Sequence, residues 1–124
     1  LSCGHPGNFV IQDCQQLRDE GFVPSHYNMR FVKPIDENIL HEVGRNYSKV
    51  ITIEDGTVVG GFGSAVLEFF ARHQYNPIVE ILGIPDRIVE HGKPSELHRE
   101  CGYDTLAVLE SVARMRALNS VEII

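Results

Sequence analysis

The residues best suited to chemistry form a glycine-rich stretch, residues 56–64, between an expected strand and an expected helix. Free N–H groups at a helix start attract anions, and glycine lets a ligand approach the backbone closely. The spacing matches neither the dinucleotide fingerprint nor the Walker loop. Gly60, Gly61, Gly63 and Ser64 are therefore a candidate anion-binding site. The favoured interpretation is structural, with the glycines permitting a tight turn and close helix–sheet packing.

A second candidate is the charged loop at residues 84–92, which carries Asp86, Arg87, Glu90 and His91. A carboxylate beside a histidine can perform acid–base catalysis. Charged residues in such loops more often form ion pairs that fix the loop or contact a neighbouring domain than take part in catalysis. We therefore expect an interdomain role for these four residues. The sequence shows no nucleophile elbow and no spacing typical of a Ser-His-Asp triad, so no catalytic residue is assigned.

Two further pairs have both a chemical and a structural interpretation. Glu54 and Asp55 close an expected central strand at its carboxyl end, where they would either face a substrate or cap the turn. His98 and Cys101 have the spacing of half a zinc site. Because no second pair with matching spacing follows, we predict no metal in this chain and expect a half-buried Cys beside a surface His.

Helix-type and strand-type periodicity alternate along the chain. Asn8 and Asp36 are expected N-caps, Gly21 is an expected C-cap glycine, and Asp104 is expected to cap the last helix. That last helix is expected to bury Leu106, Leu109, Val112 and Ala113. The expected helices cover residues 9–20, 36–46, 62–75, 94–102 and 105–118, and the expected strands cover residues 1–4, 22–32, 50–53 and 78–82. This order predicts one three-layer α/β domain over residues 1–124, with a mostly parallel sheet.

The composition limits the classes of partner. The chain has 124 residues, 43% hydrophobic, with a net charge of -6 and no adjacent Lys or Arg pair. This acidity disfavours nucleic acid and anionic membrane surfaces. Three cysteines without a C-x-x-C pair suit free thiols in a reducing compartment, so a cytoplasmic location is expected. The chain starts at Leu1, and we expect it to be part of a longer polypeptide.

Four blocks in order resemble the 1-deoxy-D-xylulose-5-phosphate synthase family. The blocks are MRFVKPID at residues 29–36, TIEDG followed by GGFGSAVLEF at residues 52–69, LGIPDR with EHG at residues 82–92, and EL with CG at residues 96–102. They are similar to the family's "RFVKPLD", "TIEDG…GGFGSAVLEF", "LGIPDRFIEHG" and "ELH…CGLD". The stretch around His5 and Asn8 departs from the family's Ala-rich segment, which leaves a divergent paralogue as an alternative.

The resemblance implies the C-terminal domain of a transketolase-like chain, with a five-stranded sheet of which one strand is antiparallel. The whole enzyme would join pyruvate to glyceraldehyde 3-phosphate with loss of carbon dioxide, using thiamine diphosphate and magnesium. This domain would hold no cofactor and would pack against the N-terminal domains and in a homodimer. The alternatives are an anion- or nucleotide-binding regulatory module, or the C-terminal domain of another transketolase-family enzyme.

Overall fold

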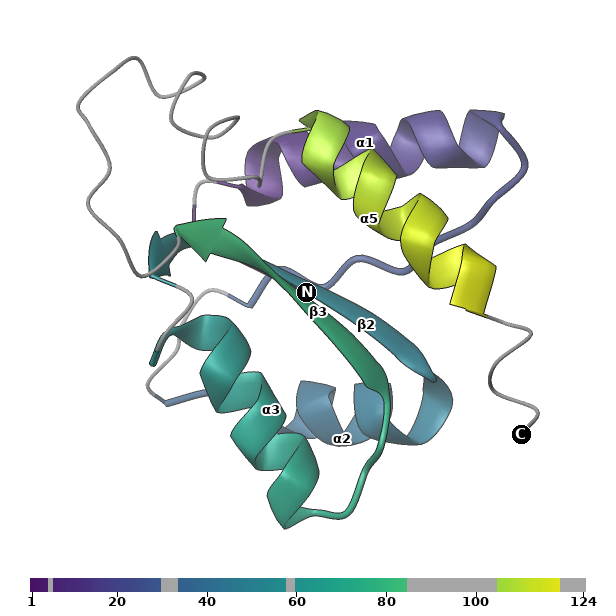
Figure 1. Cartoon of the computed structure of the whole chain (residues 1–124). Helices are drawn as coiled ribbons and strands as arrows, with labels where there is room; N and C mark the ends of the chain where they lie inside the picture. The colour runs from purple at the N-terminus through teal and green to yellow at the C-terminus, as the bar shows by residue number, and fades with distance from the viewer. Residues whose placement is uncertain (5, 30–33, 58–59, 85–104, 119–124) are drawn as a thin grey trace.

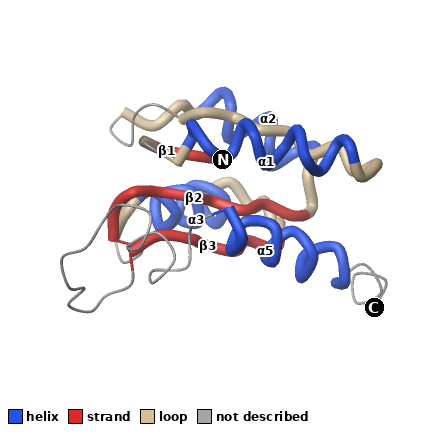
Figure 2. Tube along the Cα trace, turned by 90° about the horizontal axis from the view of Figure 1, so that it is seen from above, coloured by secondary structure: helices blue, strands red, loops and turns tan. Residues whose placement is uncertain are grey.

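The protein has three layers, with a parallel sheet between two pairs of helices (Figure 1). The computed structural model describes residues 1–4, 6–29, 34–57, 60–84 and 105–118. Helices α1 and α5 cover one face of the sheet, and α2 and α3 cover the other. Figure 2, seen from above, shows the three strands in the order β1, β2 and β3. In chain order the elements are β1 (Ser2–Cys3), α1 (Gly7–Asp19), α2 (Glu37–Asn46), β2 (Lys49–Thr57), α3 (Phe62–Arg72), β3 (Ile78–Ile84) and α5 (Thr105–Ala117).

The sheet has the order β1-β2-β3 and both pairings are parallel. Ser2 lies opposite Ile53, and an isolated parallel bridge joins Ser2 to Asn28 on the other side of β1. The predicted parallel α/β sheet is therefore confirmed. Within the described residues it has three strands, so the strand number of five stays a prediction. Strand β2 continues to Thr57, so the glycine-rich loop begins later than expected.

Helix α1 begins earlier than predicted. Its N-cap is Pro6, so the prediction of an Asn8 cap is wrong. The fixed φ of proline suits the start of a helix, and this local preference places the first turn at Gly7. The helix ends as expected: Gly21 has φ +90°, its N–H donates to the Arg18 carbonyl, and the Phe22 N–H donates to the Leu17 carbonyl. These two bonds are a Schellman motif.

Helices α2 and α3 supply the larger core. The Asp36 side chain accepts the N–H of Ile39 at 3.1 Å, which confirms the predicted N-cap of α2. The amphipathic pattern of α3 is also confirmed, because its apolar positions are buried against α2 and β2. The buried residues of this cluster are Met29, Leu40, Val43, Val50, Phe62, Val66, Phe69 and Phe70. Helix α3 ends at Arg72, before the predicted Asn76–Pro77 stop, because Gln74 turns the chain with φ +61°.

Helix α5 buries only part of the face predicted. Val112 is buried as predicted, but Leu106 is 50% exposed and Ala113 is exposed, and Val108 and Met115 are buried instead. The small residues Ala107 and Ser111 are buried beside this stripe, which brings the helix close to α1 and the sheet. The buried stripe follows helical spacing, but it starts two residues later than the expected one. The prediction failed because Leu106 was taken as the first core position.

The prediction of a strand over residues 22–32 is wrong for its described part, residues 22–29, where only Asn28 forms an isolated bridge, to Ser2. Pro24 contributes to this, because proline cannot donate to a strand ladder.

Other expectations lie outside the described residues. These are the charged loop at residues 84–92 apart from residue 84, the short helix at 94–102 and the Asp104 cap. Among the helices that the structure describes, none has the length and hydrophobicity to span a bilayer.

Candidate functional site

The carboxyl ends of β1 and β2 meet the start of α3 at one edge of the sheet. Cys3 ends β1 opposite Glu54, and β2 leads through the glycine-rich stretch to Gly61, the N-cap of α3. Open α/β sheets bind ligands at this edge. The candidate anion-binding residues are therefore placed where such a site would be expected.

Gly63 lies in direct contact with the sheet. A Cβ atom built at this position would be 2.7 Å from Thr52 Oγ1 and 2.7 Å from Ile81 Cγ2. Distances this short exclude a side chain, so the first turn of α3 can reach the sheet only with glycine here. This confirms the structural interpretation of Gly63 as a residue that permits close helix–sheet packing. Gly60 has φ +72°, a conformation that glycine adopts without strain.

Glu54 caps α3 from the neighbouring strand. Its Oε2 atom accepts the N–H of Gly63 at 2.7 Å, and the N–H of Phe62 also donates to the carboxylate. The N-cap residue Gly61 has no side chain to do this. A carboxylate at this position satisfies the free N–H groups of the first turn and interacts favourably with the helix dipole. Of the two interpretations of Glu54, capping is the one that the geometry supports.

The Glu54 carboxyl is deeply buried, with 3% of the residue exposed. Burial raises its pKa, and the hydrogen bonds from Gly63 and Phe62 oppose that rise. Its Oε1 atom is buried without a hydrogen-bond partner among the described residues. The Glu54 carboxyl therefore makes its backbone hydrogen bonds through an environment that also disfavours its charged form.

The four candidate anion-binding residues form a helix start that is already capped. Gly63 donates its N–H to Glu54, and the Gly60 N–H donates to Ser64 Oγ at 3.2 Å. An external anion would have to compete with the Glu54 carboxylate for the same N–H groups.

Of the other candidates, only Asp55 lies within the described residues, and it follows Glu54 on β2 at this edge. Asp86, Arg87, Glu90 and His91 lie outside the described ranges, as do His98 and Cys101. Asp55 is described and exposed. Within the described part of the chain, no three or more His, Cys, Asp or Glu side chains are grouped so that they could hold a metal ion.

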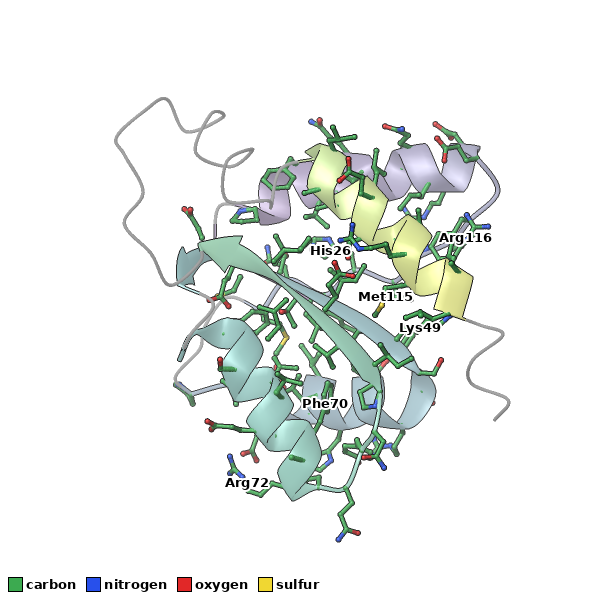
Figure 3. All side chains as sticks on the ribbon, viewed as in Figure 1. His26, Lys49, Phe70, Arg72, Met115 and Arg116 are labelled. Carbon is green, nitrogen blue, oxygen red and sulfur yellow. The ribbon has the colours of Figure 1, made fainter. Side chains whose placement is uncertain are left out.

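One feature that the sequence did not indicate is a groove of about 580 Å³ beside β1. We call it the strand groove: it lies between residues 24–27 and residues 49–51, with α1 and α5 on one side and α2 on the other. Four residues that line it are labelled in Figure 3, namely His26, Lys49, Met115 and Arg116. Its walls come from segments far apart in the sequence, so no local pattern could have revealed it.

Comparison with known proteins gives the family. The model of the family described as "Transketolase, C-terminal domain" matches residues 1–108. The chain is 55% identical over 115 residues to a 1-deoxy-D-xylulose-5-phosphate synthase of Cytophaga hutchinsonii, covering 93% of this chain and 18% of that protein. It is 44% identical over 112 residues to the enzyme of that name from Aquifex aeolicus, covering 90% of this chain and 18% of that protein.

A solved structure shares the fold. It is described as "Split gene transketolase, inactive beta4 tetramer" and superposes with a TM-score of 0.84 at 28% identity, covering 94% of this chain and 38% of that one. The chain thus spans about a fifth of the length of the curated relatives it matches. The family match over residues 1–108, the identity to the curated relatives and the shared fold lead to one conclusion. This chain belongs to the transketolase C-terminal domain family.

Proposed function

We propose that the chain is the C-terminal domain of a 1-deoxy-D-xylulose-5-phosphate synthase and that alone it catalyses no reaction. The observation that carries this proposal is the 55% identity over 93% of the chain to a protein of that name, of which it spans 18%. The parent enzyme would then make deoxyxylulose phosphate from pyruvate and glyceraldehyde 3-phosphate in the cytoplasm. It would use thiamine diphosphate and magnesium.

The described residues do not fit these cofactors. A diphosphate needs N–H groups or cations, and the start of α3 already has the Glu54 carboxylate against its N–H groups. This contact supports binding of the diphosphate by other domains of the parent enzyme, and we propose that magnesium is bound there with it.

The proposed role of this domain is to pack against the N-terminal domains of its own chain and to contribute to a homodimer. Two contacts support a structural role: Gly63 packs directly against the sheet, and the Glu54 side chain caps the start of α3. In this proposal the sheet has five strands in the complete domain. Asp86, Arg87, Glu90 and His91 would contact the neighbouring domains.

Calorimetry on the purified chain tests the proposal. Thiamine diphosphate with magnesium is titrated into the chain, and product formation is assayed with pyruvate and glyceraldehyde 3-phosphate. We expect neither heat of binding at micromolar cofactor nor deoxyxylulose phosphate. Micromolar binding or turnover by the chain would overturn the proposal.

A further inference from the structure

Two histidines from different helices lie next to each other where α2 packs against α3. His41 is in the middle of α2, and His73 is the C-cap residue of α3, on the same face of the sheet (Figure 1). Their imidazole ring centroids are 4.6 Å apart, and the ring planes meet at 74°. The two residues come from distant parts of the sequence, so only the fold brings these imidazoles together.

Both imidazole rings pack on the same buried side chain, Phe69. The His73 ring lies against the Phe69 ring with centroids 4.3 Å apart and planes at 37°. The His41 ring meets the Phe69 ring edge-on, at 4.9 Å and 73°. Because Phe69 is fixed in the core of the protein, these contacts orient the two imidazoles before any ligand binds.

Tyr75 holds the His41 ring through a hydrogen bond. Its hydroxyl lies 2.9 Å from His41 Nδ1. The Tyr75 ring is itself fixed by an edge-on contact with Phe70 and by Gly44, where an added Cβ would lie 2.5 Å from Tyr75 Cδ2. Histidines that bind metals usually donate their second ring N–H to a neighbouring oxygen, which fixes the tautomer and the ring orientation. When Nδ1–H donates to the Tyr75 hydroxyl, the free lone pair of His41 is on Nε2.

The remaining ring nitrogens are available to a ligand. His73 is exposed, and within the described part of the chain its ring makes aromatic contacts but no hydrogen bond. His41 is half-buried, and the hydrogen bond that the described residues give its ring is at Nδ1. Zinc–nitrogen bonds of about 2.0–2.1 Å place the ring centroids of two imidazoles on one ion about 4.5–5 Å apart. The observed separation of 4.6 Å meets this requirement.

We propose that His41 and His73 bind one divalent transition-metal ion of the zinc type, with Tyr75 positioning the His41 ring. Imidazole nitrogens suit Zn²⁺, Cu²⁺ and Ni²⁺, whereas Mg²⁺ and Ca²⁺ prefer oxygen ligands. Within the described residues no third His, Cys, Asp or Glu joins the pair, so water would complete the coordination and the ion would bind reversibly. Bound to both helices, the ion would hold α2 against α3 and stabilise the folded chain.

This metal site goes beyond the function proposed above and does not depend on it. The magnesium of the parent enzyme is proposed to bind in other domains, whereas His41 and His73 lie on two helices of this chain. The sequence-based prediction of no metal rested on the spacing of His98 and Cys101. It did not consider residues that lie far apart in the sequence.

Zinc titration of the purified chain tests the proposal, because Zn²⁺ has no redox chemistry that would oxidise the cysteines. ZnCl₂ is expected to raise the Tm, whereas MgCl₂ at the same concentration is not. His73→Gln and His41→Gln are each expected to weaken zinc affinity, measured by calorimetry, at least tenfold. His98→Gln is the matched control and is expected to retain the wild-type affinity.

Tyr75→Phe separates metal binding from packing. The variant keeps the ring that contacts Phe70 and removes the hydroxyl that contacts His41. Loss of such a partner typically weakens metal affinity about 10- to 100-fold, and we expect a loss of zinc affinity in that range. The Tm of each variant without metal is measured first, so that a change in folding is not counted as a change in affinity.

No rise in Tm and no heat of binding at millimolar zinc would overturn the proposal. Wild-type affinity in His73→Gln or His41→Gln would also overturn it, as would loss of affinity in His98→Gln. Unchanged affinity in Tyr75→Phe would overturn the positioning of His41. If a variant does not fold, Ni²⁺ is added to the wild-type chain. Paramagnetic broadening of the His41 and His73 ring signals is then expected in the NMR spectrum, and its absence would overturn the proposal.

Discussion

Glu54, on β2, accepts the backbone N–H of Gly63, on α3, at 2.7 Å in the interior of the protein. The contact joins the end of a central strand to the start of the helix that follows it. It places a carboxylate where an anion would otherwise bind. Gly63, in the glycine-rich stretch that most resembled a ligand site in the sequence, therefore makes contacts within the fold, with Glu54 and with the sheet.

Replacing Gly63 with Ala tests the close packing of α3 on the sheet. The added Cβ would lie 2.7 Å from both Thr52 Oγ1 and Ile81 Cγ2. Overpacking of this kind costs about 1–3 kcal/mol, even though alanine favours a helix more than glycine does. The free energy of unfolding, measured by urea denaturation, is expected to fall by that amount.

Gly7→Ala is the matched control for this variant. Gly7 also lies in a helix, but the atoms nearest to its added Cβ would be side-chain atoms of Asn28 and Ser2 at 3.2 Å, which is longer than the 2.7 Å contacts at Gly63. We expect its unfolding free energy to change by less than about 1 kcal/mol. Equal stability of the Gly63→Ala variant and the wild type would contradict the packing described for α3.

Glu54→Gln tests whether the buried carboxyl titrates with a raised pKa. Burial raises the pKa of Glu54 in the folded state, so the folded state binds more protons than the unfolded state above the ordinary pKa of 4.5. The wild type therefore loses stability relative to Glu54→Gln as the pH rises through the raised pKa. Urea denaturation of both proteins from pH 4.5 to 8 measures this difference. A difference that grows in favour of the wild type would contradict the assignment.

Much of the fold could be predicted because its signals are local. Asp36 and Gly21 are placed by cap preferences that act within a few residues, and the buried face of α3 follows from the spacing of Phe62, Val66 and Phe69. The predicted start of α1 and part of the predicted buried face of α5 were wrong, and the reasons are also local. The N-cap of α1 is Pro6 rather than Asn8, and Leu106, which was predicted to be buried, is exposed.

The site was less predictable because it depends on distant pairs. The sequence placed Glu54 at a strand end and Gly63 at a helix start, but it did not reveal that one caps the other. The strand groove is formed by residues as far apart as Leu1, Tyr47 and Met115, which only the folded sheet brings together.

The most direct test of the proposed function is a chimera in which this chain replaces the matching C-terminal part of the Cytophaga hutchinsonii 1-deoxy-D-xylulose-5-phosphate synthase. Synthesis of deoxyxylulose phosphate is measured for the chimera, for the same enzyme without its C-terminal part, and for this chain alone. We predict activity in the chimera within tenfold of the intact enzyme, and none in the other two. A folded, dimeric chimera without activity, or activity in this chain alone, would contradict the account.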